Sequence, residues 1–346
     1  MNRKWPGRLL KITILLVSFI VVFYKIKEFY FSSTHELNKL FNYGNNMILL
    51  LIVGLMCLNW LFEAIRWKCL ISSIQNITII HSMHSVLVGI TAGLLTPKRL
   101  GEAGGRIVVM DRDNQIKGIP AFALGSVIQT SVTAFFGIVA GLALIFHYTT
   151  HGLENINLLL IISSIVLLLL LFLIFNLPLT VKWLLKISWM KKYAHIFNTL
   201  PSQSRKKTAI LLGISMLRYL TFSFQFFLLI RLFDQSAGVM ETFTGIGLTY
   251  FIVTFLPLSS LVELGVRGSV AGFVFGMFTI QPGSGVLAVF SLWIINLGLP
   301  AILGAFIVYH SNHIETELSS LKRKINGISF FKRFSLTKKF KQVKKV

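Results

Sequence analysis

The chain has 346 residues, of which 54% are hydrophobic and 13% are charged, and its formal net charge is +22. Soluble domains carry about 25% charged residues, so this composition indicates a membrane protein. The basic residues lie between long apolar runs, which favours anionic lipid over nucleic acid as the partner. With only Cys57 and Cys69, the chain has no disulfide framework and no four-cysteine zinc site. We expect neither a metal nor another cofactor.

The apolar runs predict how often the chain crosses the bilayer. Residues 9–24 follow a basic N-terminus without a small-residue cleavage site behind them, so we interpret them as an uncleaved span. A helix needs roughly 20 apolar residues to cross a hydrocarbon core of about 30 Å. Further runs of suitable length are 46–64, 119–146, 156–177, 208–232 and 285–309. The sequence therefore predicts an all-α polytopic membrane protein with six full spans.

Two further apolar regions, 82–117 and 241–283, are interrupted by proline, glycine and charged residues. The loop 178–207 and the tail 321–346 contain many Lys and Arg residues and no acid, which is typical of cytoplasmic segments. A single crossing by either broken region would place one of these basic segments outside. We therefore predict two re-entrant or broken helical hairpins, the first entered from the cytoplasm and the second from outside, related as an inverted repeat.

The same charge distribution divides the chain into two parts. Residues 1–320 form the predicted integral membrane domain, and residues 321–346 form a basic cytoplasmic tail. Each cation of such a tail contributes about 1 kcal/mol to adsorption on anionic lipid. Both termini are expected in the cytoplasm.

Each broken region has a proline, then a glutamate, then an arginine four residues after the glutamate. Broken helices at corresponding positions of two halves point to the substrate site of a transporter. A Glu and an Arg at this spacing share a helix face and can pair, and arginine binds phosphate through two parallel hydrogen bonds. An ion pair that only locks each hairpin is the alternative interpretation. The predicted substrate-binding residues are Thr96, Pro97, Arg99, Glu102, Arg106, Pro257, Ser259, Glu263, Arg267 and Arg218.

Three charged residues within or beside full spans need separate interpretation. Arg218 lies well inside the run 208–232, and because a lone arginine there is costly we expect it to face the bundle interior near a glutamate. Glu63 and Arg66 lie at the cytoplasmic end of the second span. Glu63 is a weaker candidate for extending the cavity, and we interpret Arg66 as an interfacial residue that snorkels to the surface. No Walker loop, nucleophile elbow or zincin motif occurs, so we expect no enzyme.

The stretch from Gly93 to Glu102, together with Leu256-Pro-Leu-Ser and Leu264-Gly-Val-Arg267, resembles two hallmark segments of the lysylphosphatidylglycerol synthase transmembrane region family of flippase-like proteins. The similarity extends over residues 8–315. The resemblance implies a protein of the bacterial cytoplasmic (inner) membrane. In fused relatives the membrane region moves an aminoacylated phospholipid outward, and a soluble domain makes that lipid. Only the short basic tail follows the last span, so we expect a stand-alone member without a synthase domain.

Taken together, these features predict a translocase that moves an anionic phospholipid or lipid-linked head group by alternating access. Two alternatives stay open at this point: a secondary transporter of a small anion, and a non-transporting scaffold for a cell-envelope enzyme. The expected partner is anionic membrane lipid, with a separate lipid-modifying enzyme as an open second partner and no nucleic acid. The oligomeric state is open.

Overall fold

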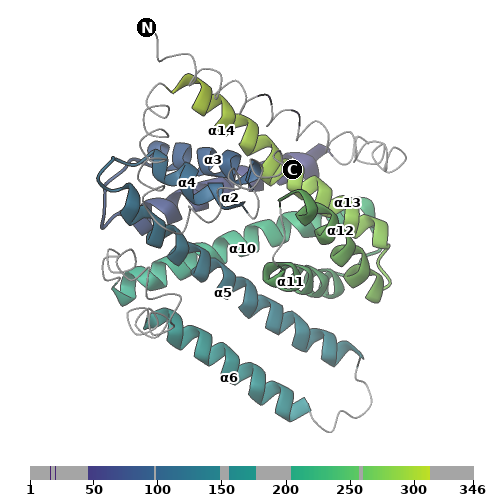
Figure 1. Cartoon of the computed structure of the whole chain (residues 1–346). Coiled ribbons are helices and arrows are strands. Elements are labelled where there is room, and N and C mark those ends of the chain that lie inside the picture. Colours follow the sequence, from purple (N-terminus) through teal and green to yellow (C-terminus); the bar gives the residue numbers. More distant parts are fainter. Residues whose placement is uncertain are drawn as a thin grey trace, which may run out of the picture.

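The computed structural model describes residues 16, 20, 46–96, 99–148, 156–176, 204–256 and 260–311, and in these ranges it contains helices and no strand. The all-α prediction is therefore confirmed for this part of the chain. The predicted first span and the basic tail 321–346 lie almost entirely outside it. In chain order the helices (Figure 1) are α2 Asn46–Ile71, α3 Ile79–Leu94, α4 Gly101–Val108, α5 Gln115–Tyr148, α6 Ile156–Phe175, α10 Arg205–Phe233, α11 Val239–Phe255, α12 Ser260–Met277, α13 Pro282–Trp293, the π-helix η3 Ile294–Gly298 and α14 Leu299–His310.

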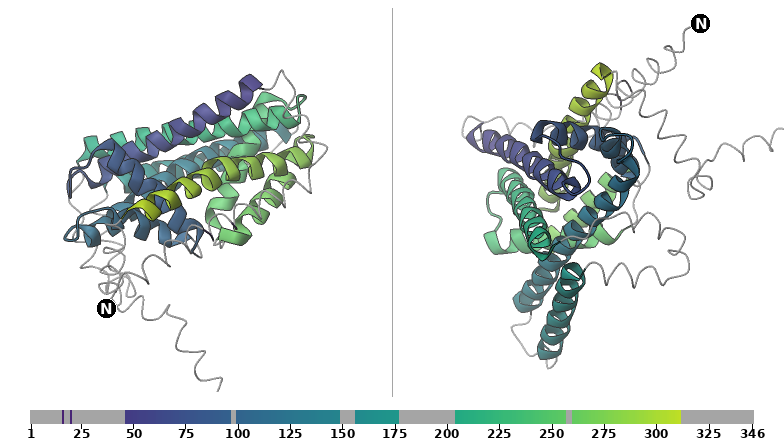
Figure 2. Two further views of the ribbon diagram at one scale, coloured as in Figure 1. Left: turned by 90° about the horizontal axis from the view of Figure 1, so that it is seen from above. Right: turned by 90° about the vertical axis from the view of Figure 1, so that its left-hand side faces the viewer.

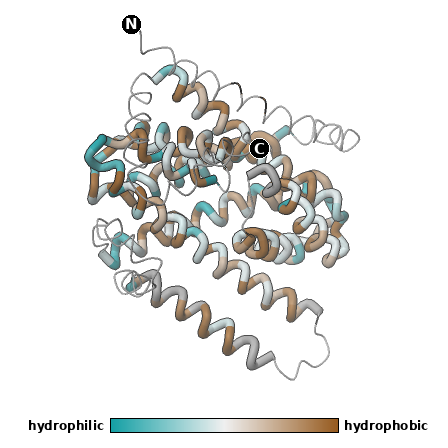
Figure 3. Tube along the Cα trace, in the orientation of Figure 1, coloured by the Kyte–Doolittle hydropathy of each residue, from teal (hydrophilic) through white to brown (hydrophobic). Residues whose placement is uncertain are grey.

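Four of the predicted full spans correspond to helices long and apolar enough to cross a membrane. These are α2, residues 115–146 of α5, α10, and the continuous stretch 282–310 formed by α13, η3 and α14. Helix α6 coincides with the predicted run 156–177. Apolar residues predominate along α5 and α6 (Figure 3), and large apolar side chains such as Leu50, Ile165 and Leu217 are exposed. Such an outer surface is typical of contact with lipid.

Hydrogen bonds at the two ends of the bundle establish the path of the chain. At one end, which we call the Lys207 end, Lys207 Nζ donates to Ser73 Oγ at 2.6 Å. The Asp111 backbone N–H there donates to Gln75 Oε1 at 3.1 Å. At the other end, the Asp234 end, the Gln281 N–H donates to Asp234 Oδ2 at 3.1 Å. The chain thus leaves α2 and enters α5 at the Lys207 end, and leaves α10 and enters α13 at the Asp234 end.

Each broken region is consequently a pair of helices that begins and ends on one side of the bundle. Helices α3 and α4 form the first pair and α11 and α12 the second, and the two pairs lie toward opposite ends of the long helices α2, α10 and α13–α14 (Figures 1 and 2). This path agrees with the even number of crossings deduced from loop charge. The depth of each pair in a bilayer, and hence its re-entrant character, stays a prediction.

Two separate apolar clusters hold the described part together. One contains Trp67, Val86, Ile107 and Ile128, and so joins α2 and α5 to the first broken pair. The other contains Phe226, Ile246, Phe275 and Leu292, and joins α10 and α13 to the second broken pair. The region between these clusters is where the polar residues described below are found.

Glycines allow α3 to approach its neighbours at backbone distance. A Cβ atom on Gly105 of α4 would lie 2.6 Å from the Val88 carbonyl oxygen, and one on Gly304 of α14 would lie 2.2 Å from the Leu87 carbonyl oxygen. Beside Gly304, Thr91 Oγ1 donates to the Ala301 carbonyl at 2.8 Å. Small residues at helix contacts are the usual means of close packing in membranes. The first broken pair is thus fixed directly to α14.

We expect Gly304→Ala to destabilise the protein, because the new methyl group would press on the backbone of α3. Overpacking of this kind costs roughly 1–3 kcal/mol. The measurement is the thermal unfolding midpoint of the purified protein in detergent. Gly54→Ala is the matched control, since a Cβ there has no neighbour within 4 Å. Equal midpoints for the two variants would contradict the close α3–α14 contact.

Candidate functional site

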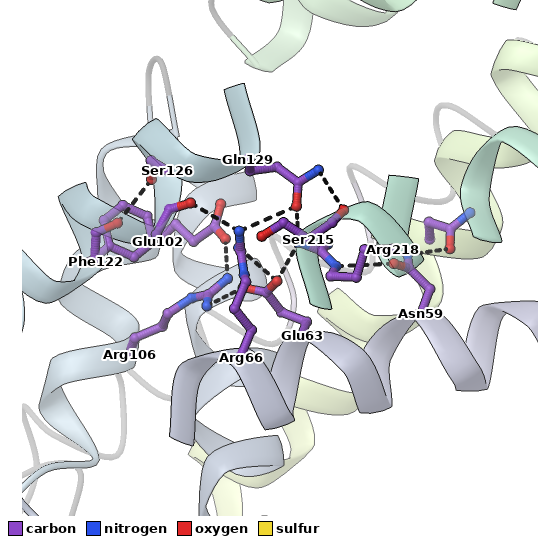
Figure 4. Close-up of polar contacts among 12 residues, drawn as sticks. Asn59, Glu63, Arg66, Glu102, Arg106, Phe122, Ser126, Gln129, Ser215 and Arg218 are labelled. Carbon is purple, nitrogen blue, oxygen red and sulfur yellow. Dashed lines mark hydrogen bonds and ion pairs between the residues drawn. The ribbon is translucent and has the colours of Figure 1, made fainter. Parts of the chain in front are cut away.

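A buried glutamate of α2 stands at the centre of the polar interior. Glu63 is 3% exposed, and its carboxylate forms ion pairs with three arginines from three helices. Arg66 of α2 approaches it at 2.7 Å, while Arg106 of α4 and Arg218 of α10 complete the set. Figure 4 shows the guanidinium groups converging on this carboxylate. One acid therefore links α2, the first broken pair and α10.

A second acid, Glu102, extends the cluster within the first broken pair. Its oxygens lie 2.6 Å from Arg106 Nη2 and 3.0 Å from Arg99 Nη2. Because Glu102 and Arg106 are four residues apart on α4, this contact confirms the predicted pairing along one helix face. Arg106 bridges both glutamates.

The position of Arg106 depends on its neighbours in α2, α3 and α5. Its guanidinium carbon lies 5.7 Å from the Trp67 ring centroid and 5.3 Å from that of Phe122, within the range of cation–π contacts. Gly89 leaves space for its side chain, since a Cβ there would lie 2.6 Å from Arg106 Cγ. Ser85 Oγ also donates to the Arg106 carbonyl at 2.7 Å. The arginine is consequently held in one place before any ligand arrives.

Amide side chains continue the cluster across the bundle. Gln129 Oε1 of α5 accepts hydrogen bonds from Arg66 and Arg218, each at 3.2 Å. Asn59 Oδ1 accepts from Arg218 Nε at 3.2 Å, and Asn59 Nδ2 donates to Asn296 Oδ1 at 3.3 Å. Asn296 in turn donates to Gln225 Oε1 at 2.8 Å. This chain of polar contacts runs from α4 to η3.

The π-helix η3 interrupts the long stretch 282–310 at the residue that lines the site. Pro300 has no N–H to donate to the Asn296 carbonyl, and the helix widens just before it. Short π-helical turns within α-helices are frequent at functional sites. Here the interruption places Asn296 against Asn59 and Gln225.

A cavity of about 300 Å³ lies beside these groups and is bordered by both broken pairs. The first pair contributes Glu102 and Arg106, with Arg99 just before α4, and the second contributes Tyr250 and Arg267. Polar residues from the other helices also border it, among them Asn59, Glu63, Gln129, Arg218 and Asn296. The apolar and aromatic part of the lining includes Val86, Ile90, Phe222, Phe226, Val253, Val289, Leu292, Trp293 and Leu297. The lining of the cavity thus combines arginines with apolar side chains.

The structure brings together much of the predicted site. Arg99, Glu102, Arg106, Arg218 and Arg267 all line the cavity. Arg218 faces the interior and pairs with a glutamate, as expected. Substrate binding by these residues stays a prediction.

Thr96 has a local contact that the sequence did not indicate. Its hydroxyl accepts from the Gly101 N–H at 2.7 Å and donates to the Ala92 carbonyl at 2.9 Å, so it braces the turn before α4. The other predicted residues lie outside the described part: Pro97, Pro257 and Ser259 entirely, and Glu263 by its side chain.

The interpretation of Arg66 as a residue that snorkels to the surface is wrong. Arg66 is 6% exposed, and it points inward to Glu63, to Gln129 and to the Gly125 carbonyl, which accepts from Nη1 at 2.9 Å. The reason is that α2 continues to Ile71, well beyond the predicted run 46–64. Glu63, predicted only as a weak candidate, is the centre of the cluster because Arg106 and Arg218 reach it from other helices. The amides Asn59, Gln129 and Asn296 were missed altogether, although each is a polar residue in an apolar run.

No group of three or more His, Cys, Asp or Glu residues converges in a metal-binding arrangement within the described ranges. Beside the two carboxylates of Glu63 and Glu102, the site contains four arginines that line the cavity and several amides, and these groups donate hydrogen bonds to anions. The chemistry supported by this donor set is recognition of a negatively charged group.

Residues 8–304 match the family model of the lysylphosphatidylglycerol synthase TM region. The chain belongs to this family. Neither the curated proteins nor the solved structures compared with the chain gave a match. Membership and the apolar helices together identify a multi-pass membrane protein of the lipid-related transporter kind.

We expect Glu63→Gln to destabilise the protein strongly, because three buried arginines would lose their shared counter-charge. Breaking a buried ion pair typically costs roughly 3–5 kcal/mol. Thermal unfolding in detergent measures the effect, with Asp113→Asn as a control that changes an exposed carboxylate in the same way. A Glu63→Gln variant as stable as that control would show that the cluster does not depend on Glu63.

Proposed function

We propose that this protein translocates an anionic phospholipid or lipid-linked head group across the bacterial cytoplasmic membrane by alternating access. The observation that carries the proposal is a cavity bordered by both broken pairs and lined by arginines together with apolar side chains. A lipid likewise combines a charged head group with apolar chains. Membership of a family of lipid-related membrane proteins supports this reading.

The arrangement of the two pairs supports alternating access. Arg106 belongs to the pair that starts and ends at the Lys207 end, and Arg267 belongs to the pair that starts and ends at the Asp234 end. Transporters built from inverted halves typically place their site where broken helices of the two halves meet. In the proposed cycle, the head group contacts arginines of both pairs while the bundle opens first to one side and then to the other.

A secondary transporter of a small soluble anion is the second candidate. The arginines would serve a free anion equally well, and a cavity of about 300 Å³ accommodates a head group or a small solute alike. The two candidates differ in whether the transported molecule has acyl chains. No chemical reaction is assigned to the chain under either.

The translocation assay uses purified protein in liposomes that contain a fluorescent anionic phospholipid, whose exposure is read by dithionite quenching. We expect Arg267→Gln to slow translocation at least tenfold, because a cationic contact in the cavity is lost. Arg231→Gln is the matched control, since Arg231 donates to the Ala237 carbonyl at the Asp234 end and does not line the cavity. Unchanged translocation in Arg267→Gln would defeat the proposal, and uptake of soluble phosphate without lipid movement would favour the second candidate.

The charges at the two ends of the bundle lead us to propose an orientation of the protein in the membrane. Arg205, Lys206 and Lys207 begin α10 at the Lys207 end, whereas the Asp234 end has Asp234 and Glu241, so the Lys207 end should face the cytoplasm. Single cysteines at Asp113 and Gln281, in a background without Cys57 and Cys69, test this with a membrane-impermeant reagent. We expect Asp113→Cys to label only from the cytoplasm and Gln281→Cys only from outside. The opposite pattern would invert the proposed orientation.

A further inference from the structure

We infer that the cavity takes a phosphate group with two negative charges, a phosphate monoester or a diphosphate, in preference to a phosphodiester with one. That a lipid carries this phosphate group follows from the proposed function, on which this part of the inference rests. The preference for two negative charges is argued from the residues of the cavity.

The charges of the described site do not balance. Arg99, Arg106, Arg218 and Arg267 line the cavity, and Arg66 adjoins it through Glu63. Against these five cations stand two acids, Glu63 and Glu102, which leaves an excess of three positive charges among the described residues. Counting Glu263, whose side chain is not described, would still leave two. An anion of charge −2 would offset most of this excess.

Amides occupy the positions where further acids would have balanced the charge. Gln129 Oε1 accepts from both Arg66 and Arg218, and Asn59 Oδ1 accepts from Arg218. A glutamate or an aspartate has almost the same shape and would pair with these guanidinium groups more strongly. These amides therefore accept hydrogen bonds from Arg66 and Arg218 without adding negative charge to the site.

Three residues that line the cavity carry buried hydrogen-bond donors without a partner among the described residues. Trp60 Nε1, Thr249 Oγ1 and Arg106 Nε are buried, and none has a hydrogen-bond partner among the described residues. All three residues line the cavity. Buried donors without partners are costly unless a ligand or water satisfies them. A phosphate monoester offers three terminal oxygens as acceptors, whereas a diester offers two.

The same charge excess opposes a cationic head group. The head group of lysylphosphatidylglycerol has two ammonium groups and one phosphodiester, which gives it a net charge of +1. Like charges repel strongly where the surroundings are of low dielectric. For this member of the family, the cavity favours a head group of different charge from the one in the family name.

The first experiment compares lipids that share short acyl chains and differ in head-group charge. Binding to the purified full chain in detergent is measured as thermal stabilisation. The pH is 8, above the second pKa of a phosphate monoester of about 6, so that the monoester carries two negative charges. We expect half-maximal stabilisation by phosphatidic acid at a concentration at least tenfold lower than by phosphatidylglycerol. Lysylphosphatidylglycerol should be the weakest of the three. Equal concentrations for phosphatidic acid and phosphatidylglycerol would overturn the inference, and this comparison needs no variant.

The second experiment changes the charge of the cavity without removing an arginine. Gln129→Glu adds one negative charge at a side chain that already contacts two guanidinium groups. We expect it to raise the unfolding midpoint of the ligand-free protein and to weaken phosphatidic acid binding at least tenfold. Gln75→Glu is the matched control, since Gln75 lies at the Lys207 end and accepts only the Asp111 N–H among the contacts described. A Gln129→Glu variant with unchanged lipid preference would contradict the charge argument.

Soluble anions separate this inference from the proposed function. Inorganic phosphate or pyrophosphate could stabilise the protein as well as phosphatidic acid does, with Gln129→Glu weakening the binding of both. That result would support the preference for an anion with two charges and would contradict lipid translocation. If phosphatidylglycerol is bound and translocated as well as phosphatidic acid, lipid translocation stands and the charge preference is wrong.

Discussion

A buried carboxylate that serves three buried arginines is the interaction on which this structure depends. An arginine at the centre of a bilayer costs roughly 2.5–3.5 kcal/mol on insertion scales, and a second or third in the same interior would add to that cost. Glu63 offsets part of this cost, because it forms ion pairs with Arg66, Arg106 and Arg218 at the same time. Because these arginines come from α2, α4 and α10, the pairing requires the first broken pair to lie against the two long helices.

Close backbone packing makes room for these polar groups inside an apolar bundle. Gly89 leaves the space that the Arg106 side chain occupies, and Gly105 lets α4 reach the backbone of α3. On the far side of the cavity, Pro300 and the π-helix before it place Asn296 within reach of two other amides. The π-helical interruption of the stretch 282–310 thus coincides with a residue of the site. The broken helices position charge as well as shape the path of the chain.

The sequence predicts the chain path and part of the site for reasons that are local. Loop charge predicted that each broken region begins and ends on one side, in agreement with the path of the chain, and the four-residue spacing predicted the contact between Glu102 and Arg106. The sequence indicated Glu63 only as a weak candidate because its partners Arg106 and Arg218 come from other helices. Contacts between residues so far apart in the chain cannot be deduced from sequence spacing. Arg66 was misjudged because hydropathy falls at residue 64, whereas the helix continues to bury Trp67, Leu70 and Ile71. Packing decided the extent of α2, not hydropathy alone.

The two glutamates of the cluster differ in a way that matters for the proposed cycle. The side chain of Glu63 is 4% exposed and holds three arginines, whereas that of Glu102 is 15% exposed and holds two. An entering phosphate competes with these carboxylates for the same guanidinium groups. Both carboxylates border the cavity, but Glu102 is more exposed and has fewer partners. Exchange at Arg99 and Arg106 therefore disturbs the structure less than exchange at Glu63 would. In the proposed cycle Glu63 therefore keeps the helices together while Glu102 yields its arginines to the substrate.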